Sequence, residues 1–107
     1  MGLRIEEYLS PNGESPFRKW LDGLDLSVKA RIQARVLRFE TGNLGDHKPL
    51  GGGIWEARLS FGPGYRIYFG RQSATTLVLL LLGGDKSSQA ADIRKAQEYW
   101  NDYLGGT

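Results

Sequence analysis

The sequence contains no cysteine and a single histidine, His47. Without cysteine the chain can form neither a disulfide framework nor a thiolate metal site or nucleophile. One histidine cannot build the histidine cluster of a zinc site. A partial phosphate-loop pattern at residues 83–88 fails because Asp85 stands where the last glycine is needed. We therefore expect neither a metal nor a nucleotide or other cofactor.

Long apolar runs are also absent. The longest, Leu77 to Leu82, is far shorter than the roughly 20 residues of a membrane-spanning helix. Residues 1–10 alternate charged and apolar positions where a secretory signal needs an uninterrupted apolar stretch. With 107 residues, 40% of them hydrophobic, the chain is long enough for one domain and too short for two. We expect one cytoplasmic domain over residues 1–107, with no membrane contact.

The first half of the sequence predicts one strand and two helices. Residues 3–9 form a strand-like run that ends at the turn formers of residues 10–13. Ser15 predicts a helix N-cap with Pro16 in the first turn, and Asp25 caps a second helix that runs to about residue 41. The apolar stripe of that second helix is expected to face a sheet, with the cations elsewhere on its surface. These cations are Lys29, Arg31, Arg35 and Arg38.

The second half predicts the rest of the sheet and a last helix. Residues 43–53 are rich in glycine and contain a proline, which indicates a flexible loop. Strand-like runs follow at 54–60, 65–71 and 75–82. The first two form a hairpin, and the third, apolar on both faces, ends at Gly83-Gly84. A helix from about residue 88 to residue 104 carries Trp100 on its apolar side. The predicted order is β-α-α-β-β-β-α.

Cations gather on these strands and on the loops beside them: Lys48, Arg58, Arg66, Arg71 and Lys86. If the helices cover one face of the sheet, the cations collect on the other. Aromatic residues among them could stack on bases, namely Trp55, Tyr65 and Tyr68. A net charge of +2 permits a nucleic-acid partner without requiring one. RNA binding and an ordinary solvated sheet face explain this pattern equally well.

The length of the hairpin loop decides whether two of these cations meet. A four-residue loop that pairs Ser60 with Tyr65 would place Arg58 and Arg66 on opposite faces. A bulge or an odd-numbered loop would bring them together, and the glycines of residues 61–64 permit either.

Three residues are candidates for acid–base chemistry: Glu56, His47 and Asp85. Glu56 lies two residues before Arg58 and most simply forms a same-face ion pair with it, with a general base as the alternative. His47 is a residue type suited to proton transfer near neutral pH, although it falls in the expected flexible loop.

Three segments in order resemble the addiction-module killer proteins, a phage-associated branch of the RelE and HigB toxin superfamily. They are KPLGGGIWEAR at 48–58, GPGYRIY at 62–68 and LLLGGDKSSQ at 80–89. The resemblance implies an α+β, RelE-like fold in which two N-terminal helices and a C-terminal helix accompany an antiparallel sheet. It also implies a cognate antitoxin, of helix-turn-helix type and encoded beside the toxin.

Known relatives cleave mRNA on the ribosome, which implies an endoribonuclease that blocks translation with mRNA and the ribosome as partners. By this resemblance Arg66, in the Gly-Tyr-Arg motif, clamps the phosphate, with Lys86 and Arg58 as further catalytic cations. Three other residues are expected to bind substrate: Lys48, Tyr68 and Arg71. Where RelE has a functional tyrosine near the start of its last helix, this sequence has Ile93.

Two other functions use the same scaffold. A ParE-like toxin inhibits DNA gyrase by binding and performs no chemistry. An inactive member only binds its antitoxin. Convergence of the arginines and lysines on the sheet favours RNA cleavage, whereas a functional surface on the two N-terminal helices favours gyrase.

Overall fold

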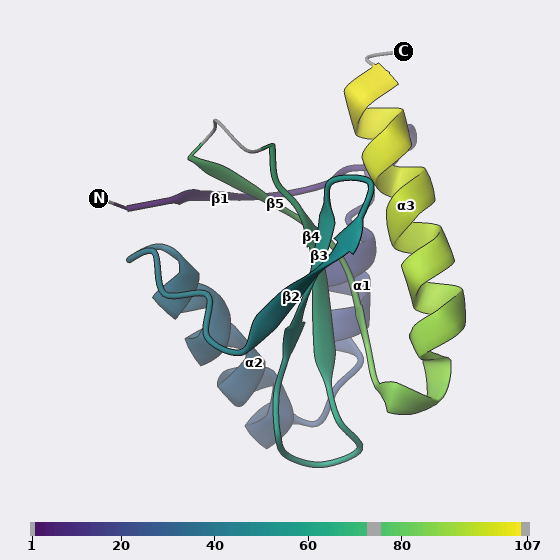
Figure 1. Cartoon of the computed structure of the whole chain (residues 1–107). Helices are drawn as coiled ribbons and strands as arrows, with labels where there is room; N and C mark the ends of the chain where they lie inside the picture. The colour runs from purple at the N-terminus through teal and green to yellow at the C-terminus, as the bar shows by residue number, and fades with distance from the viewer. Residues whose placement is uncertain (1, 73–75, 106–107) are drawn as a thin grey trace.

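The computed structural model describes residues 2–72 and 76–105, and its helices pack against one five-stranded sheet (Figure 1). The elements are β1 Arg4–Glu7, α1 Pro16–Asp22, α2 Leu26–Phe39, β2 His47–Gly51, β3 Ile54–Arg58, β4 Arg66–Gly70, β5 Leu77–Gly84, the 3-10 turn η1 Lys86–Ser88, and α3 Gln89–Gly105. This order contains one strand more than the predicted β-α-α-β-β-β-α.

Both predicted N-caps are confirmed. The Ser15 hydroxyl accepts a hydrogen bond from the backbone N–H of Arg18 at 3.0 Å, and Pro16 opens α1. The Asp25 carboxylate accepts from the N–H of Ser27 at 3.1 Å and so starts α2. Each cap satisfies a backbone donor that has no partner inside its helix.

Arg35 corrects the prediction that all the cations of α2 lie on its surface. The residue is only 6% exposed. Its guanidinium group donates to the carbonyl oxygens of Leu44, Asp46 and Arg58 at 3.1, 2.9 and 2.8 Å. A buried cation is tolerated here because its N–H groups have partners. Arg35 thereby connects α2 with the segment before β2 and with the last residue of β3.

The sheet has the strand order β1-β5-β4-β3-β2. The expectation of an antiparallel sheet is wrong at one edge, where β1 runs parallel to β5 with Arg4 opposite Leu77. The other neighbouring strands are antiparallel. Parallel pairing requires a long connection between the two strands, and both N-terminal helices and three strands supply it here.

The strand β2 overturns the flexible loop expected at residues 43–53. It pairs with β3, with Lys48 opposite Glu56 and Pro49 opposite Trp55. The sequence signal was turn-like because proline and glycine dominate this segment. Proline is tolerated in β2 because this strand forms the edge of the sheet, where only one side needs backbone partners.

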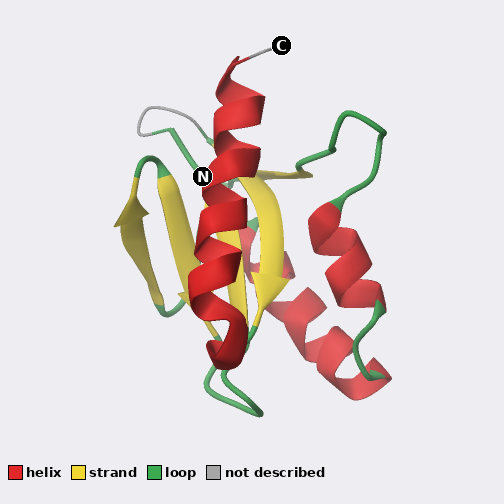
Figure 2. Cartoon of the chain, turned by 90° about the vertical axis from the view of Figure 1, so that its right-hand side faces the viewer, coloured by secondary structure: helices red, strands yellow, loops and turns green. Residues whose placement is uncertain are grey.

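Helices cover both faces of the sheet. Figure 2 shows α3 crossing in front of the sheet, with the other two helices behind it and to one side. One core lies under α1 and α2 and includes Phe17, Ile32, Phe39, Ile67 and Phe69. A second core under α3 includes Tyr68, Leu79, Leu81 and Trp100, which confirms Trp100 as a core residue. The face that we expected to remain open to solvent is therefore largely covered by α3. None of the helices within 2–72 and 76–105 has the length and apolar character needed to cross a membrane.

The strand β5 is covered on both sides, as its apolar pattern predicted. Thr75, the predicted first residue, lies outside the described residues. The predicted break at Gly83-Gly84 is wrong, because both glycines belong to β5. A side chain at Gly83 would overlap the ring of Trp20 in α1, and one at Gly84 would overlap the carboxylate of Asp92 in α3. These glycines let a helix approach each face closely.

Candidate functional site

Arg58 and Arg66 lie directly opposite each other where the β3–β4 hairpin meets its loop. The N–H of Leu59 donates to the carbonyl oxygen of Tyr65 at 2.9 Å, so residues 60–64 form the loop between this pair. The loop has an odd number of residues, and opposed residues of an antiparallel pair share a face. The sequence left both registers open, and the structure brings the two arginines together.

Each arginine has a carboxylate beside it. Arg66 has a side chain only 12% exposed, with its Nε 3.5 Å from Oε1 of Glu56, and its Nη1 donates to the carbonyl of Gly64 at 2.9 Å. Arg58 is 40% exposed, and its Nη2 lies 3.1 Å from Oδ1 of Asp46. The carboxylates offset the repulsion between two opposed guanidinium groups. Arg66 is held by its neighbours, whereas Arg58 presents its charge to solvent.

Glu56 does not form the ion pair expected of it. Its partner is Arg66 on the neighbouring strand, because Arg58 turns to Asp46 instead. Glu56 has no exposed surface, and its Oε1 accepts a hydrogen bond from Nε2 of Gln89 at 2.9 Å. A carboxylate so enclosed has no route to a hydroxyl group of a substrate on the surface.

Lys86 lies against the hairpin loop directly after β5. Its backbone N–H donates to the carbonyl of Pro63 at 3.4 Å, and the residue is exposed. A Cβ atom at Gly64 would lie 3.3 Å from Nη1 of Arg66 and 3.4 Å from Cβ of Lys86, so this glycine fits between the two residues. We refer to Arg58, Arg66 and Lys86 as the cation cluster.

Asp85 is the N-cap of η1 rather than a free acid or base. Its Oδ1 accepts hydrogen bonds from the hydroxyl of Ser87 at 2.6 Å and from the N–H of Ser87 at 2.8 Å. These hydrogen bonds, that of the hydroxyl first, hold the pKa of Asp85 below its usual value. The carboxylate is therefore a weak base that stabilises the turn carrying Lys86.

His47 does not join the cation cluster. It begins β2 opposite Ala57, so it faces α1 and α2, whereas Glu56 faces α3. Its Nδ1 lies 2.7 Å from the carbonyl oxygen of Gly45, and its ring packs 5.6 Å from the ring of Trp55. His47 therefore lies on an ordered edge strand and not in the flexible loop that we expected.

Two of the expected substrate-binding cations are not members of the cation cluster: one borders it and the other lies far from it. Lys48 is exposed on β2 and shares the face of Glu56, so it borders the cluster on one side. Arg71 follows β4 at the end opposite to Arg66, which places it roughly 16 Å away at the rise of an extended chain.

The aromatic residues do not form the expected stacking surface. Tyr68 has no exposed surface, so its ring cannot stack on a base. Burial, and after it the charge of Glu56, raise the pKa of the Tyr68 hydroxyl. Trp55 and Tyr65 are half-buried and pack on the side of α1 and α2. Any RNA contact at the cation cluster is thus chiefly electrostatic.

Gln89 is a site residue that sequence reasoning missed. It is the first residue of α3 and reaches back to Glu56 on β3. It ends the third motif of the sequence, but no local spacing connects it with a strand so distant along the chain. Its contact depends on how α3 crosses the sheet.

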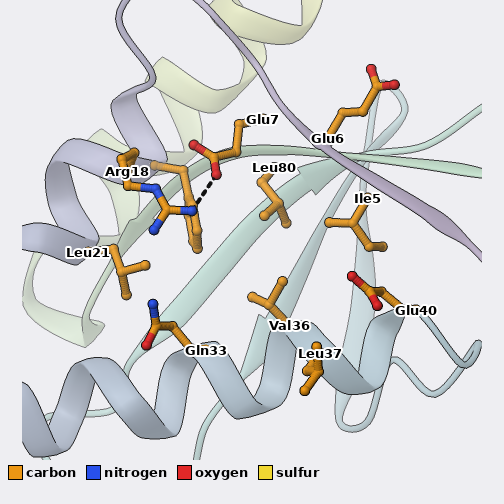
Figure 3. Close-up of a pocket in the computed structure, with 11 residues that line it drawn as sticks. Ile5, Glu6, Glu7, Arg18, Leu21, Gln33, Val36, Leu37, Glu40 and Leu80 are labelled. Atoms are coloured by element: carbon orange, nitrogen blue, oxygen red, sulfur yellow. Dashed lines mark hydrogen bonds and ion pairs between the residues drawn. The ribbon is translucent and has the colours of Figure 1, made fainter.

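A separate pocket of about 240 Å³ lies between β1, α1 and α2 (Figure 3). Its lining is mainly apolar, and the carboxylates of Glu7 and Glu40 face it, whereas that of Glu6 points away (Figure 3). The cation beside them, Arg18, is bound to Glu7 at 2.6 Å. A mainly apolar pocket whose cation is already paired attracts phosphate groups less than the cation cluster does.

No family model matches the chain. An uncharacterized protein of Haemophilus influenzae is 48% identical to it over 82 residues, which span 76% of this chain and 82% of that protein. The two proteins belong to one family. The structure of this protein is similar to one chain in the crystal structure of the toxin–antitoxin complex RelBE2 from Mycobacterium tuberculosis. The TM-score is 0.60 at 19% sequence identity, over 80% of this chain and 100% of that chain. The likeness confirms the mixed α+β fold, which this protein shares with that chain.

Proposed function

We propose that this protein is the toxin of a type II toxin–antitoxin pair, in the phage-derived addiction-module branch of the RelE and HigB superfamily. Residues 1–107 form one cytoplasmic toxin domain, and its partner is a helix-turn-helix antitoxin encoded beside it. The fold shared with a chain of the RelBE2 complex supports this role, together with the three ordered sequence motifs.

The protein acts as an mRNA endoribonuclease on the ribosome. The observation that carries this proposal is the meeting of Arg58 and Arg66 on one face, with Lys86 beside the same hairpin loop. In such cleavage the ribose 2′-hydroxyl loses its proton and its oxygen bonds to the adjacent phosphorus, the P–O5′ bond breaks, and the leaving 5′-oxygen takes up a proton. Negative charge builds up on the phosphate oxygens during this step. Cations already in place stabilise that charge without having to reorganise.

Each member of the cation cluster has its own role. Arg66 clamps the phosphate through the N–H groups that Gly64 and Glu56 leave available. Arg58 and Lys86 are more exposed and approach the same phosphate from the solvent side. Lys48 binds a neighbouring part of the message.

Acid–base catalysis has a small part in this mechanism. Glu56 is enclosed, His47 faces the other side of the sheet, and Asp85 is engaged as a cap. Ile93, at the position of the RelE tyrosine, packs against the core under α3. Cleavage therefore depends on the cations and on the ribosome holding the message in a reactive geometry.

The test is to induce the wild type and Arg66→Ala without antitoxin and to map new mRNA 5′ ends during translation. We expect codon-phased ends with the wild type, and a cleavage rate about 10²- to 10³-fold lower in the variant, the usual effect of losing one such donor. Arg38→Ala is the matched control, since Arg38 is exposed on α2, away from the cation cluster.

Other outcomes would point elsewhere. Arrested growth with intact message would overturn the nuclease proposal and indicate a binding target such as gyrase. Normal growth with intact message would indicate a member that only binds its antitoxin.

A further inference from the structure

Glu56 is buried without full compensation of its charge. The carboxylate has no exposed surface, and Gln89 donates the hydrogen bond that its Oε1 accepts. The other oxygen, Oε2, has no hydrogen-bond partner among the described residues. Removing a carboxylate from water costs free energy, and one hydrogen bond with one long ion pair offsets only part of it. A position that breaks a packing rule in this way is a candidate for a functional role.

The oxygen that Gln89 holds is the one nearest to Arg66. Oε1 lies 2.9 Å from Nε2 of Gln89 and 3.5 Å from Nε of Arg66. The carbonyl of Gly64 accepts from Nη1 on another side of the same guanidinium group. We infer that Glu56, fixed by Gln89, is a positioning residue that sets the orientation of the Arg66 guanidinium group for a phosphate. This inference rests on the proposed function.

Positioning explains the geometry better than proton transfer. A general base must come within hydrogen-bond reach of the hydroxyl that it deprotonates, and Glu56 has no surface through which a substrate could reach it. The distance of 3.5 Å to Arg66 is longer than a hydrogen bond. Glu56 therefore acts on Arg66 through its charge, which attracts the guanidinium group and holds it in place before substrate binds.

The first experiment replaces Glu56 with glutamine, which keeps the shape and removes the charge. We expect Glu56→Gln to lower kcat for mRNA cleavage on purified translating ribosomes about 10- to 100-fold, with KM nearly unchanged, the effect of a misplaced catalytic group. The change removes the charge of the unpartnered Oε2 but leaves the nearly buried Arg66 without its carboxylate, so the urea midpoint is measured beside kcat to separate stability from activity.

Ile54→Val is the matched control, since Ile54 lies two residues earlier on β3, on the same face and equally buried. It should lower the urea midpoint and leave kcat unchanged. A fall in kcat for Glu56→Gln that only parallels a loss of stability would contradict positioning, and so would full activity.

A double-mutant cycle isolates the route of the effect. If Glu56 acts through Arg66, adding Glu56→Gln to Arg66→Ala causes no further loss of cleavage. Losses that multiply would show that Glu56 acts independently of Arg66 and would overturn the inference.

A readout on the free protein separates this inference from the proposed function. NMR relaxation of the Arg66 Nε–H group should show a less ordered side chain in Glu56→Gln and in Gln89→Ala. The second variant provides the same test if Glu56→Gln does not fold. Loss of order in a protein that cleaves no RNA would refute the nuclease proposal and retain the structural link. Unchanged order in both variants would refute the link, even in an active nuclease.

Discussion

Removal of the Arg35 side chain should strongly destabilise the fold. The guanidinium group is the donor for the carbonyl oxygens of Leu44, Asp46 and Arg58. The hydrogen bond to Leu44 is buried, whereas those to Asp46 and Arg58 are only partly buried, so water can replace the donor at these two. Arg35→Ala therefore leaves one buried carbonyl group without a donor and weakens two partly buried contacts.

The magnitude follows from the cost of such groups. The buried acceptor of Leu44 left unsatisfied costs about 1–3 kcal/mol, and each of the two partly buried hydrogen bonds contributes about 0.5–1.5 kcal/mol. We expect Arg35→Ala to lower the free energy of unfolding by about 3 kcal/mol, a large share of the roughly 5–15 kcal/mol of a typical domain.

The assay is urea unfolding followed by tryptophan fluorescence. With a slope of about 1–3 kcal/mol per molar urea, the midpoint should fall by about 1–3 M at an unchanged slope. Arg38→Ala is the control on the same helix, because Arg38 is exposed, and it should stay within about 0.5 kcal/mol of the wild type. Equal midpoints for the two variants would refute the role assigned to Arg35.

Two further predictions concern the close approach of helices to the sheet and the response to alkali. Gly83→Ala and Gly84→Ala should each destabilise by about 1–3 kcal/mol, because the new methyl group meets a helix side chain. Gly23→Ala, with ordinary contacts at 3.5 Å, is their control, and equal urea midpoints would contradict the packing argument. Burial, followed by the hydrogen bond to Asp102, raises the pKa of Tyr8 to about 12 from 10.0. The folded state thus holds this proton more tightly than the unfolded state. The free energy of unfolding therefore keeps this contribution below pH 10 and loses it as the pH rises toward 12. In Tyr8→Phe the free energy of unfolding, measured by urea titration at several pH values, should fall less between pH 10 and pH 12. An equal fall in the variant and the wild type would contradict the assignment to Tyr8.

Local signals predicted the helices better than the sheet. Ser15, Pro16 and Asp25 mark the starts of α1 and α2 because capping is decided within one turn. The edge strand β2 was missed because Pro49 and its glycine neighbours have turn propensities, which pairing with β3 overrides. The parallel partner of β1 could not be predicted from either strand alone, since nonlocal contacts determine it.

The candidate site shows the same division. Its residue types and their grouping on the strands were readable from the sequence, whereas the meeting of Arg58 and Arg66 depended on one residue of loop length. The burial of Glu56 and Tyr68 was missed because both lie under α3, whose crossing the sequence does not encode locally. The burial of Arg35 was missed because its carbonyl partners lie far along the chain. Gln89 was missed for the same reason.

The pairing of β1 with β5 also determines when the sheet can be completed during synthesis of the chain. The first strand to be made has to wait for the last one, because Arg4 pairs with Leu77. Gln89 follows later still, so the surroundings of Arg66 are among the last parts to assemble. Pairings between such distant segments make folding slow. A newly synthesised chain therefore passes through an interval in which both helices are already made and the cation cluster is not yet complete.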